Sequence, residues 1–207
     1  MNPWVKICGV RNAEDAQFAF DHGADAVGLM FAESKRRLTF GEGKNLCQSL
    51  APRRSGQSLV GVFVNEDPAH VRTCYQECGL DLVQLHGDES DEYIQNLGLP
   101  VIRVIRVRDQ QDLSVSDERF HKSAVLLDSY SPDERGGSGK VFAWDKAKKL
   151  ADAGISFYLA GGLTPENVRD AMMISGASGV DVSSGVESNG LKDLSKIKHF
   201  IDQAKKK

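Results

Sequence analysis

Residues 157–185, FYLAGGLTPENVRDAMMISGASGVDVSSG, contain a complete strand–helix–strand unit. Two short apolar runs, 157–160 and 179–182, enclose an amphipathic stretch. The stretch opens with Thr164-Pro165-Glu166: a capping hydroxyl, a proline whose missing N–H is not needed, and an acid facing the positive end of the helix dipole. Gly176 is the expected helix stop. The unit predicts two parallel strands joined by a crossover helix.

The same alternation extends along the rest of the chain. The other apolar runs are short, rich in Val, Ile, Leu and Ala, and several lack polar alternation, as expected for parallel strands covered on both faces. We expect these further strands at 4–8, 26–31, 58–64, 82–85, 101–107 and 124–127. We expect the other helices at 12–23, 41–50, 68–78, 90–97, 110–120, 145–153 and 192–204.

About eight strand–helix repeats predict the α/β class, and specifically a single-domain (β/α)8 TIM barrel covering residues 1–207. No linker interrupts the repeats. The alternative is an open doubly wound sheet, which usually has a Gly-rich dinucleotide loop after an early strand. Only CGVRN, residues 8–12, follows the first strand here, and this favours the barrel.

The composition argues against several classes of function. The net charge is −3, so the chain has no positive excess for a phosphate backbone, and we expect no nucleic-acid partner. Hydrophobic residues make up 41%, close to the globular average, and we expect no membrane association. The four cysteines show no CxxC spacing and the N-terminus has no apolar signal core. We therefore expect free thiols in a reducing, cytoplasmic environment.

Two glycine- and serine-rich segments follow the last two expected strands. They are Gly161-Gly162 and Ser183-Ser184-Gly185. Barrels frequently bind phosphate at these positions through backbone N–H groups, and glycine lets the main chain approach an anion closely. One such pair alone would indicate only a tight turn. Two segments in the two expected places predict a phosphate site.

Cys8 and Asp128 end the first and sixth strands and form a candidate acid–base pair. A thiolate can remove a carbon-bound proton while a carboxylic acid protonates a leaving oxygen. Their ordinary pKa values, about 8.5 and 3.9, would have to be lowered and raised respectively for this task. A small buried apolar residue is the alternative interpretation of Cys8. An acid directly after an apolar strand is not core filler.

Other candidates have two interpretations each. His86 ends the fourth strand, either as a hydrogen-bonded structural residue or as a substrate contact. Lys35-Arg36-Arg37 is either a solvated patch or the source of an arginine that pairs with a substrate carboxylate. The sequence contains no pair of histidines with metal-ligand spacing, so it does not indicate a metal site. Residues 136–140, GGSGK, lack the nucleotide-loop ending, and we expect a loop that closes over bound substrate.

In their order along the chain, these segments resemble the phosphoribosylanthranilate isomerase family of tryptophan biosynthesis. The resemblance runs from Lys6 nearly to the end. Its segments are KICG (6–9), GADAVG (23–28), VGVFVN (60–65), VQLHG (83–87), GGSGK (136–140), LAGGL (159–163) and DVSSGVE (181–187).

The resemblance implies an Amadori rearrangement of N-(5-phosphoribosyl)anthranilate, with Cys8 as general base and Asp128 as general acid. It implies no metal or organic cofactor, because the substrate's own iminium nitrogen is the electron sink. It also implies a set of substrate-binding residues: Arg36 for the anthranilate carboxylate, His86 and Asp181 lining the site, and Gly162, Ser183 and Ser184 for the phosphate.

The sequence departs from the family at two places. Lys35 stands where the family often has Pro, so both Arg36 and Arg37 are candidates for the carboxylate. Arg103 stands where the family often has Lys.

Two other functions remain open at this point. One is a noncatalytic barrel that binds a phosphometabolite, which would need neither Cys8 nor Asp128. The other is a different phosphosugar isomerase, such as one of histidine synthesis, which uses carboxylates as both acid and base; Cys8 argues against it. The partner we expect is a small phosphorylated aminosugar, and the oligomeric state is left open.

Overall fold

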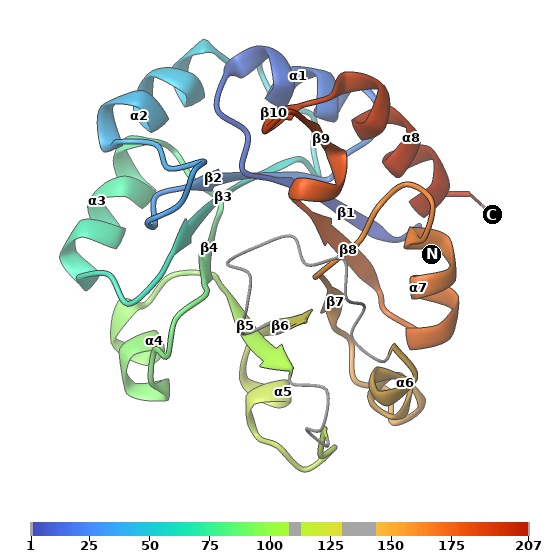
Figure 1. The fold of residues 1–207 in the computed structure, drawn as a ribbon. Helices are drawn as coiled ribbons and strands as arrows, with labels where there is room; N and C mark the ends of the chain where they lie inside the picture. Colours follow the sequence, from blue (N-terminus) through green and yellow to red (C-terminus); the bar gives the residue numbers. More distant parts are fainter. Residues whose placement is uncertain (1, 108–112, 130–143, 207) are drawn as a thin grey trace. The chain divides into compact units, whose positions relative to one another are not determined.

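Eight parallel strands pair in chain order in the computed structural model, and their order closes into a barrel. The structure describes residues 2–107, 113–129 and 144–206. Helices alternate with the strands (Figure 1), so the predicted (β/α)8 class is confirmed. The chain divides into two compact units, residues 7–104, and residues up to Lys6 together with those from Ile105 onward. That residues 1–207 form one domain stays a prediction. None of the described helices combines the length and apolar character needed to span a membrane.

The strands of the 7–104 unit lie in step with one another. Met30 pairs with Val62, Val62 with Gln84, and Gln84 with Ile102. The strands are β1 (Trp4–Cys8), β2 (Ala26–Met30), β3 (Ser58–Phe63), β4 (Leu82–Leu85) and β5 (Val101–Val107). Only the end of β1, from Ile7, and the start of β5, up to Val104, belong to this unit. The helices are α1 (Ala13–Asp21), α2 (Phe40–Ser49), α3 (Pro68–Glu77) and α4 (Asp91–Leu97).

The other unit holds the second half of the strands and a short hairpin. Leu127, Leu159 and Val180 form one row across its three strands. The strands are β6 (Ala124–Ser129), β7 (Tyr158–Leu159) and β8 (Gly179–Val182), and the helices α5 (Arg119–Lys122), α6 (Trp144–Asp152), α7 (Val168–Ser175) and α8 (Leu194–Ala204). Between β8 and α8 come the 3-10 turn η1 (Ser184–Val186) and the hairpin β9 (Glu187–Ser188) and β10 (Leu191–Lys192), seen beside the start of α8 in Figure 1.

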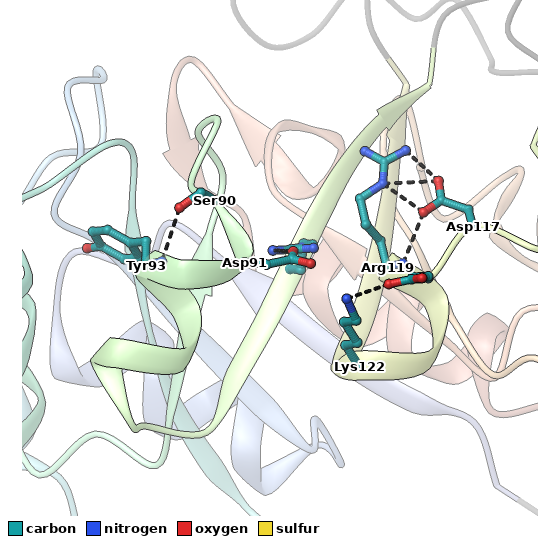
Figure 2. Close-up of polar contacts among 8 residues, drawn as sticks. Ser90, Asp91, Tyr93, Asp117, Arg119 and Lys122 are labelled. Atoms are coloured by element: carbon teal, nitrogen blue, oxygen red, sulfur yellow. Dashed lines mark hydrogen bonds and ion pairs between the residues drawn. The ribbon is translucent and has the colours of Figure 1, made fainter.

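Most helices begin where the sequence offers a cap. The side chains of Asn12, Asp67 and Asp193 accept hydrogen bonds from backbone N–H groups of the first turn, as Ser90 does for α4 (Figure 2). Gly176 ends α7 with φ 72°, as predicted, because glycine adopts the left-handed conformation without steric cost. Local capping chemistry therefore sets most of the helix positions.

Three helix predictions need correction. The helix expected at 192–204 begins at Leu194, because Lys192 ends the strand β10 and Asp193 caps the helix. The helix expected at 110–120 is wrong for residues 113–118, and α5 covers only Arg119–Lys122. Asp117 accepts hydrogen bonds from both the backbone N–H and the guanidinium of Arg119, so it starts a short turn rather than continuing a helix (Figure 2). Likewise α7 begins at Val168 rather than Thr164. The Asn167 side chain bonds the Thr164 N–H at 2.8 Å and holds a separate turn ahead of the helix.

Arg103 has a structural partner in this fold. Its side chain is buried on β5 and its Nη2 lies 2.5 Å from Oδ1 of Asp91, the first residue of α4. Asp91 also faces the positive end of the helix dipole. The ion pair therefore joins a strand to the N-terminus of a helix.

Replacing Thr39 with alanine is expected to lower the free energy of unfolding by about 1 kcal/mol. Thr39 and Glu42 form a capping box at the start of α2, in which the hydroxyl accepts from the Glu42 N–H and the carboxylate accepts from the Thr39 N–H at 2.7 Å. Urea denaturation measures the change. Thr73→Ala is the matched control, because Thr73 lies inside α3 and its hydroxyl only bonds back to the Ala69 carbonyl. Equal losses in the two variants would contradict the capping role.

The contribution of Glu42 is expected to depend on pH. The hydrogen bond from the Thr39 backbone N–H is the main reason that the pKa of Glu42 is lowered in the folded protein. A carboxyl group with a lowered folded pKa stabilises above its unfolded pKa, and that stabilisation disappears as the pH falls through the folded value. Glu42→Gln should therefore be less stable than wild type at neutral pH, and the difference should shrink as the pH falls through the lowered folded pKa of Glu42. A difference that stays constant across this range would rule out the ionised carboxylate as the cause.

Candidate functional site

Asp128 and Asp181 lie at the same level of the strands β6 and β8. Each comes directly after a member of the row formed by Leu127, Leu159 and Val180, so both side chains point to the same face. One strand separates them, which sets their backbones roughly 10 Å apart. Asp128 is half-buried and Asp181 is buried. The C-terminal edge of these strands therefore carries two carboxyl groups, at the end where barrel enzymes hold their active sites.

Asp181 forms a buried ion pair with Lys6. The Nζ atom of Lys6, whose side chain is fully buried on β1, lies 2.9 Å from Oδ2 of Asp181. The other carboxylate oxygen, Oδ1, is also buried and finds no hydrogen-bond partner among the described residues. Buried polar atoms are normally satisfied, so an unsatisfied acceptor beside the strand ends suits a hydroxyl or N–H of a ligand.

The two glycine- and serine-rich segments lie against each other. A Cβ atom on Gly185 would overlap the carbonyl oxygen of Leu163, so only glycine allows this backbone approach. Gly162 has φ 63°, and its carbonyl accepts a hydrogen bond from Nδ2 of Asn167 at 2.9 Å. The Ser183 hydroxyl oxygen is buried and has no hydrogen-bond partner within the described part of the chain. The arrangement brings together backbone and hydroxyl groups that can bind an anion.

Cys8 occupies the last position of β1 in the 7–104 unit. It is buried, with 4% of its surface exposed. The next residue, Gly9, has φ 74° and donates its N–H to the Gly28 carbonyl on β2 at 2.8 Å. This bond fixes the turn that leaves the strand directly after the thiol.

The two arginines of the loop after β2 have different environments. Arg37 is exposed and pairs with Glu33 at 2.8 Å. Arg36 is half-buried, and its backbone N–H donates to the Ser34 hydroxyl at 3.0 Å. Of the two candidates for the carboxylate, Arg36 therefore has the more enclosed side chain.

His86 follows β4 in a loop that is braced by Asn65 and Glu89. The His86 N–H donates to the Phe63 carbonyl at 2.9 Å. Glu89 accepts hydrogen bonds from the N–H groups of Asn65, at 2.7 Å, and Gly87, at 3.0 Å, and the Asn65 side chain accepts from the Asp88 N–H. Asn65 has φ 49°, a conformation that non-glycine residues adopt mainly where surrounding contacts enforce it. The half-buried His86 is thus set on a rigid loop.

The remaining cysteines do not have the properties of nucleophiles. Burial raises the pKa of the Cys47 and Cys74 thiols to about 12, and it also raises the pKa of Cys78. These groups stay protonated near neutral pH. Among the described residues, no group of three or more His, Cys, Asp or Glu side chains could hold a metal ion.

One predicted feature lies outside the described residues, and two contacts of the structure were not predicted from the sequence. The loop 136–140, expected to close over substrate, falls outside the described residues. The pairing of Lys6 with Asp181 was not predicted, although a lysine inside an apolar strand is itself a signal. The brace formed by Asn65 and Glu89 was not predicted either, and no local pattern gives a signal for it.

Comparison with known proteins gives one consistent result. Residues 5–203 match the family model described as N-(5'phosphoribosyl)anthranilate (PRA) isomerase. The N-(5'-phosphoribosyl)anthranilate isomerase of Bacillus cereus (strain G9842) is 40% identical over 202 residues, covering 97% of each chain. The crystal structure of phosphoribosyl anthranilate isomerase from Thermotoga maritima superposes with a TM-score of 0.87 at 39% identity, covering 98% of each chain. A crystal structure of a phosphoribosyl anthranilate isomerase in complex with reduced 1-(o-carboxyphenylamino)-1-deoxyribulose 5-phosphate superposes with a TM-score of 0.83 at 35% identity, covering 98% of each chain.

Gly185→Ala is expected to weaken the binding of inorganic phosphate at least about tenfold and to destabilise the protein by about 1–3 kcal/mol, the usual cost of overpacking. The new methyl group would meet the Leu163 backbone, which cannot move aside like a flexible side chain. Isothermal calorimetry and urea denaturation measure the two effects. Gly41→Ala is the matched control, since a Cβ there has open space in α2 and favours the helix. Undiminished phosphate binding in Gly185→Ala would show that this contact does not shape an anion site.

Proposed function

The chain belongs to the N-(5'-phosphoribosyl)anthranilate isomerase family, and we propose that Cys8 and Asp128 are the general base and general acid of its reaction. The reaction is the isomerisation of N-(5'-phosphoribosyl)anthranilate in tryptophan biosynthesis, catalysed by an aldose–ketose isomerase. The observation that carries the assignment is the position of both residues at the C-terminal ends of strands, with Cys8 closing β1 and Asp128 near the end of β6.

The acid step opens the sugar ring. Asp128, in its protonated form, gives its proton to the ring oxygen while the bond between C1′ and that oxygen breaks. The lone pair of the anthranilate nitrogen forms the second bond to C1′, and the product of the step is a protonated Schiff base. For this task the carboxyl group has to be partly excluded from solvent and still accessible to the substrate. The half-buried position of Asp128 supports the role.

The base step moves a proton from carbon. The Cys8 thiolate removes the C2′ proton, and the electrons of that bond flow toward the iminium nitrogen. The resulting enolamine tautomerises to the ketone, 1-(2-carboxyphenylamino)-1-deoxyribulose 5-phosphate. The substrate supplies its own electron sink, so the mechanism calls for no cofactor. Cys8 closes β1, whereas Cys47 lies on α2 and Cys74 and Cys78 lie on or just after α3, so Cys8 is the cysteine at a strand end, which supports it as the reacting thiol.

The remaining residues are proposed to bind the two charged ends of the substrate. Arg36 pairs with the anthranilate carboxylate, which its fork of N–H donors fits bidentately. His86 and Asp181 line the site, and the open Oδ1 of Asp181 accepts from a sugar hydroxyl.

The phosphate is proposed to bind at Gly162, Ser183 and Ser184. The close contact between Gly185 and Leu163 supports this site, because it joins the two loops that supply the N–H groups.

The substrate is a phosphorylated small molecule, as in the related enzyme that holds a phosphorylated product analogue. We propose that the enzyme works in the cytoplasm. Its cysteines are free thiols, which suits a reducing compartment.

Cys8→Ala and Asp128→Asn are each expected to lower kcat by about 10²- to 10⁴-fold, the usual contribution of a positioned acid or base. Turnover of N-(5'-phosphoribosyl)anthranilate by the purified chain, with a chelator present, measures the effect. Cys47→Ala is the matched cysteine control and should keep wild-type turnover, because the Cys47 thiol lies on α2 and remains protonated.

Two outcomes would contradict the proposal. Normal turnover in a folded Cys8 or Asp128 variant would reject the role assigned to that residue. Binding of the substrate by wild type without any product, as seen by calorimetry and product analysis, would favour the noncatalytic phosphometabolite-binding barrel instead.

A further inference from the structure

The hairpin between β8 and α8 has a turn that fixes which residues face each other. Asn189 and Gly190 both have positive φ, 52° and 76°, as a two-residue type I′ turn requires. Its short strands pair so that Lys192 lies opposite Glu187 and Leu191 opposite Ser188. A chain of only six residues thereby places a lysine and a glutamate side by side.

Lys192 is one of the most enclosed cations of the structure. Its Nζ donates to Oε1 of Glu187 at 2.8 Å and to the backbone carbonyl of Ser183 at 2.9 Å. The side chains of Lys192 and Glu187 are only 3% and 9% exposed. Burying such a pair costs desolvation energy that the mutual attraction barely offsets, so stability does not explain it. What the pair does achieve is to hold a full positive charge against one carbonyl oxygen.

The peptide that carries this carbonyl also carries the N–H of Ser184. In a planar trans peptide the C=O and the N–H point in opposite directions. Since Lys192 holds the Ser183 oxygen on one side, the Ser184 N–H is directed to the other side. A cation bound at the oxygen also polarises the peptide and makes its N–H a stronger donor.

The hairpin is itself anchored, so that it can serve as a fixed support. The Asp193 N–H donates to the Val186 carbonyl at 2.9 Å, and Nζ of Lys196 donates to the Glu187 carbonyl at 2.8 Å. The Ser188 hydroxyl donates to Asp193 at 2.7 Å and is the main reason that the pKa of this carboxyl is lowered. The start of α8 therefore braces the hairpin through three hydrogen bonds.

We propose that Lys192 is a positioning residue for the substrate phosphate, which acts by holding the Ser183 carbonyl so that the Ser184 N–H points at the anion. The inference rests on the proposed phosphate site at Ser183 and Ser184. Glu187 has the supporting role of keeping the Lys192 ammonium in place. Neither side chain touches the substrate, and neither takes part in proton transfer.

The test separates positioning from folding by replacing the whole ion pair. In Lys192→Met/Glu187→Leu, an apolar pair takes the place of two buried charges, a change that proteins often tolerate without loss of stability. We expect a KM for N-(5'-phosphoribosyl)anthranilate and an inhibition constant for inorganic phosphate that both rise about tenfold or more, with kcat changed less than about threefold. Lys198→Met removes an exposed lysine of α8 and is the matched control.

A measurement on the wild-type protein makes the test independent of whether the variants fold. When ¹⁵N-labelled wild type is titrated with inorganic phosphate, the Ser184 amide proton should shift strongly downfield. Phosphate binding without movement of this resonance overturns the proposal, as does a folded double variant with unchanged KM and phosphate inhibition. If the wild type fails to turn over the isomerase substrate, the proposed function fails, and phosphate binding compared between the wild type and the folded double variant then decides the role of Lys192.

Discussion

Parallel hydrogen bonding between neighbouring strands is the constraint on which the fold and the candidate site both depend. Two parallel strands cannot be joined by a tight turn, so each pair needs a crossover segment, which here contains a helix. The same pairing brings the C-terminal ends of the strands to one edge. The row Leu127, Leu159 and Val180 places the following residues, among them Asp128 and Asp181, at one level. Asp128 and Asp181, more than fifty positions apart, are thus brought to two strands separated by one other strand through backbone pairing alone.

This constraint explains why the positions of several candidate site residues could be predicted from the sequence. Apolar runs show where the strands are, and in a parallel arrangement a polar residue just past a run must lie at the functional edge. Cys8, Asp128 and His86 were found in this way, and the structure places each at or next to the end of its strand. Helix positions were equally accessible, because Ser90 and Gly176 act through contacts with residues close in sequence.

The features that escaped prediction depend on contacts distant in sequence or on elements too short to show a period. The strands of the hairpin have two residues each, a single cycle of the strand pattern, which is too short to show a period. The pair of Lys6 and Asp181 joins residues 175 positions apart. The late start of α7 is a third case, because the Thr164 hydroxyl accepts from the Glu166 N–H and the Asn167 side chain accepts from the Thr164 N–H, and these bonds form a turn ahead of the helix. A local pattern shows which groups are available, and the fold decides which of them meet.

Two buried ion pairs, Lys6 with Asp181 and Lys192 with Glu187, lie at the end of β8 and in the hairpin after it. We argue that their role is to orient polar groups of this segment rather than to stabilise the fold. Lys6 holds a carboxylate oxygen of Asp181, and Lys192 holds the carbonyl oxygen of Ser183, two residues later. An exposed pair such as Lys198 with Asp202 leaves both partners free to move and contributes little. A buried pair sacrifices solvation but gains a fixed geometry. Since the segment from Asp181 to Ser183 is fixed at both ends by ammonium groups, the groups that remain open there, Oδ1 of Asp181 and the Ser183 hydroxyl, are presented to a ligand in a single arrangement.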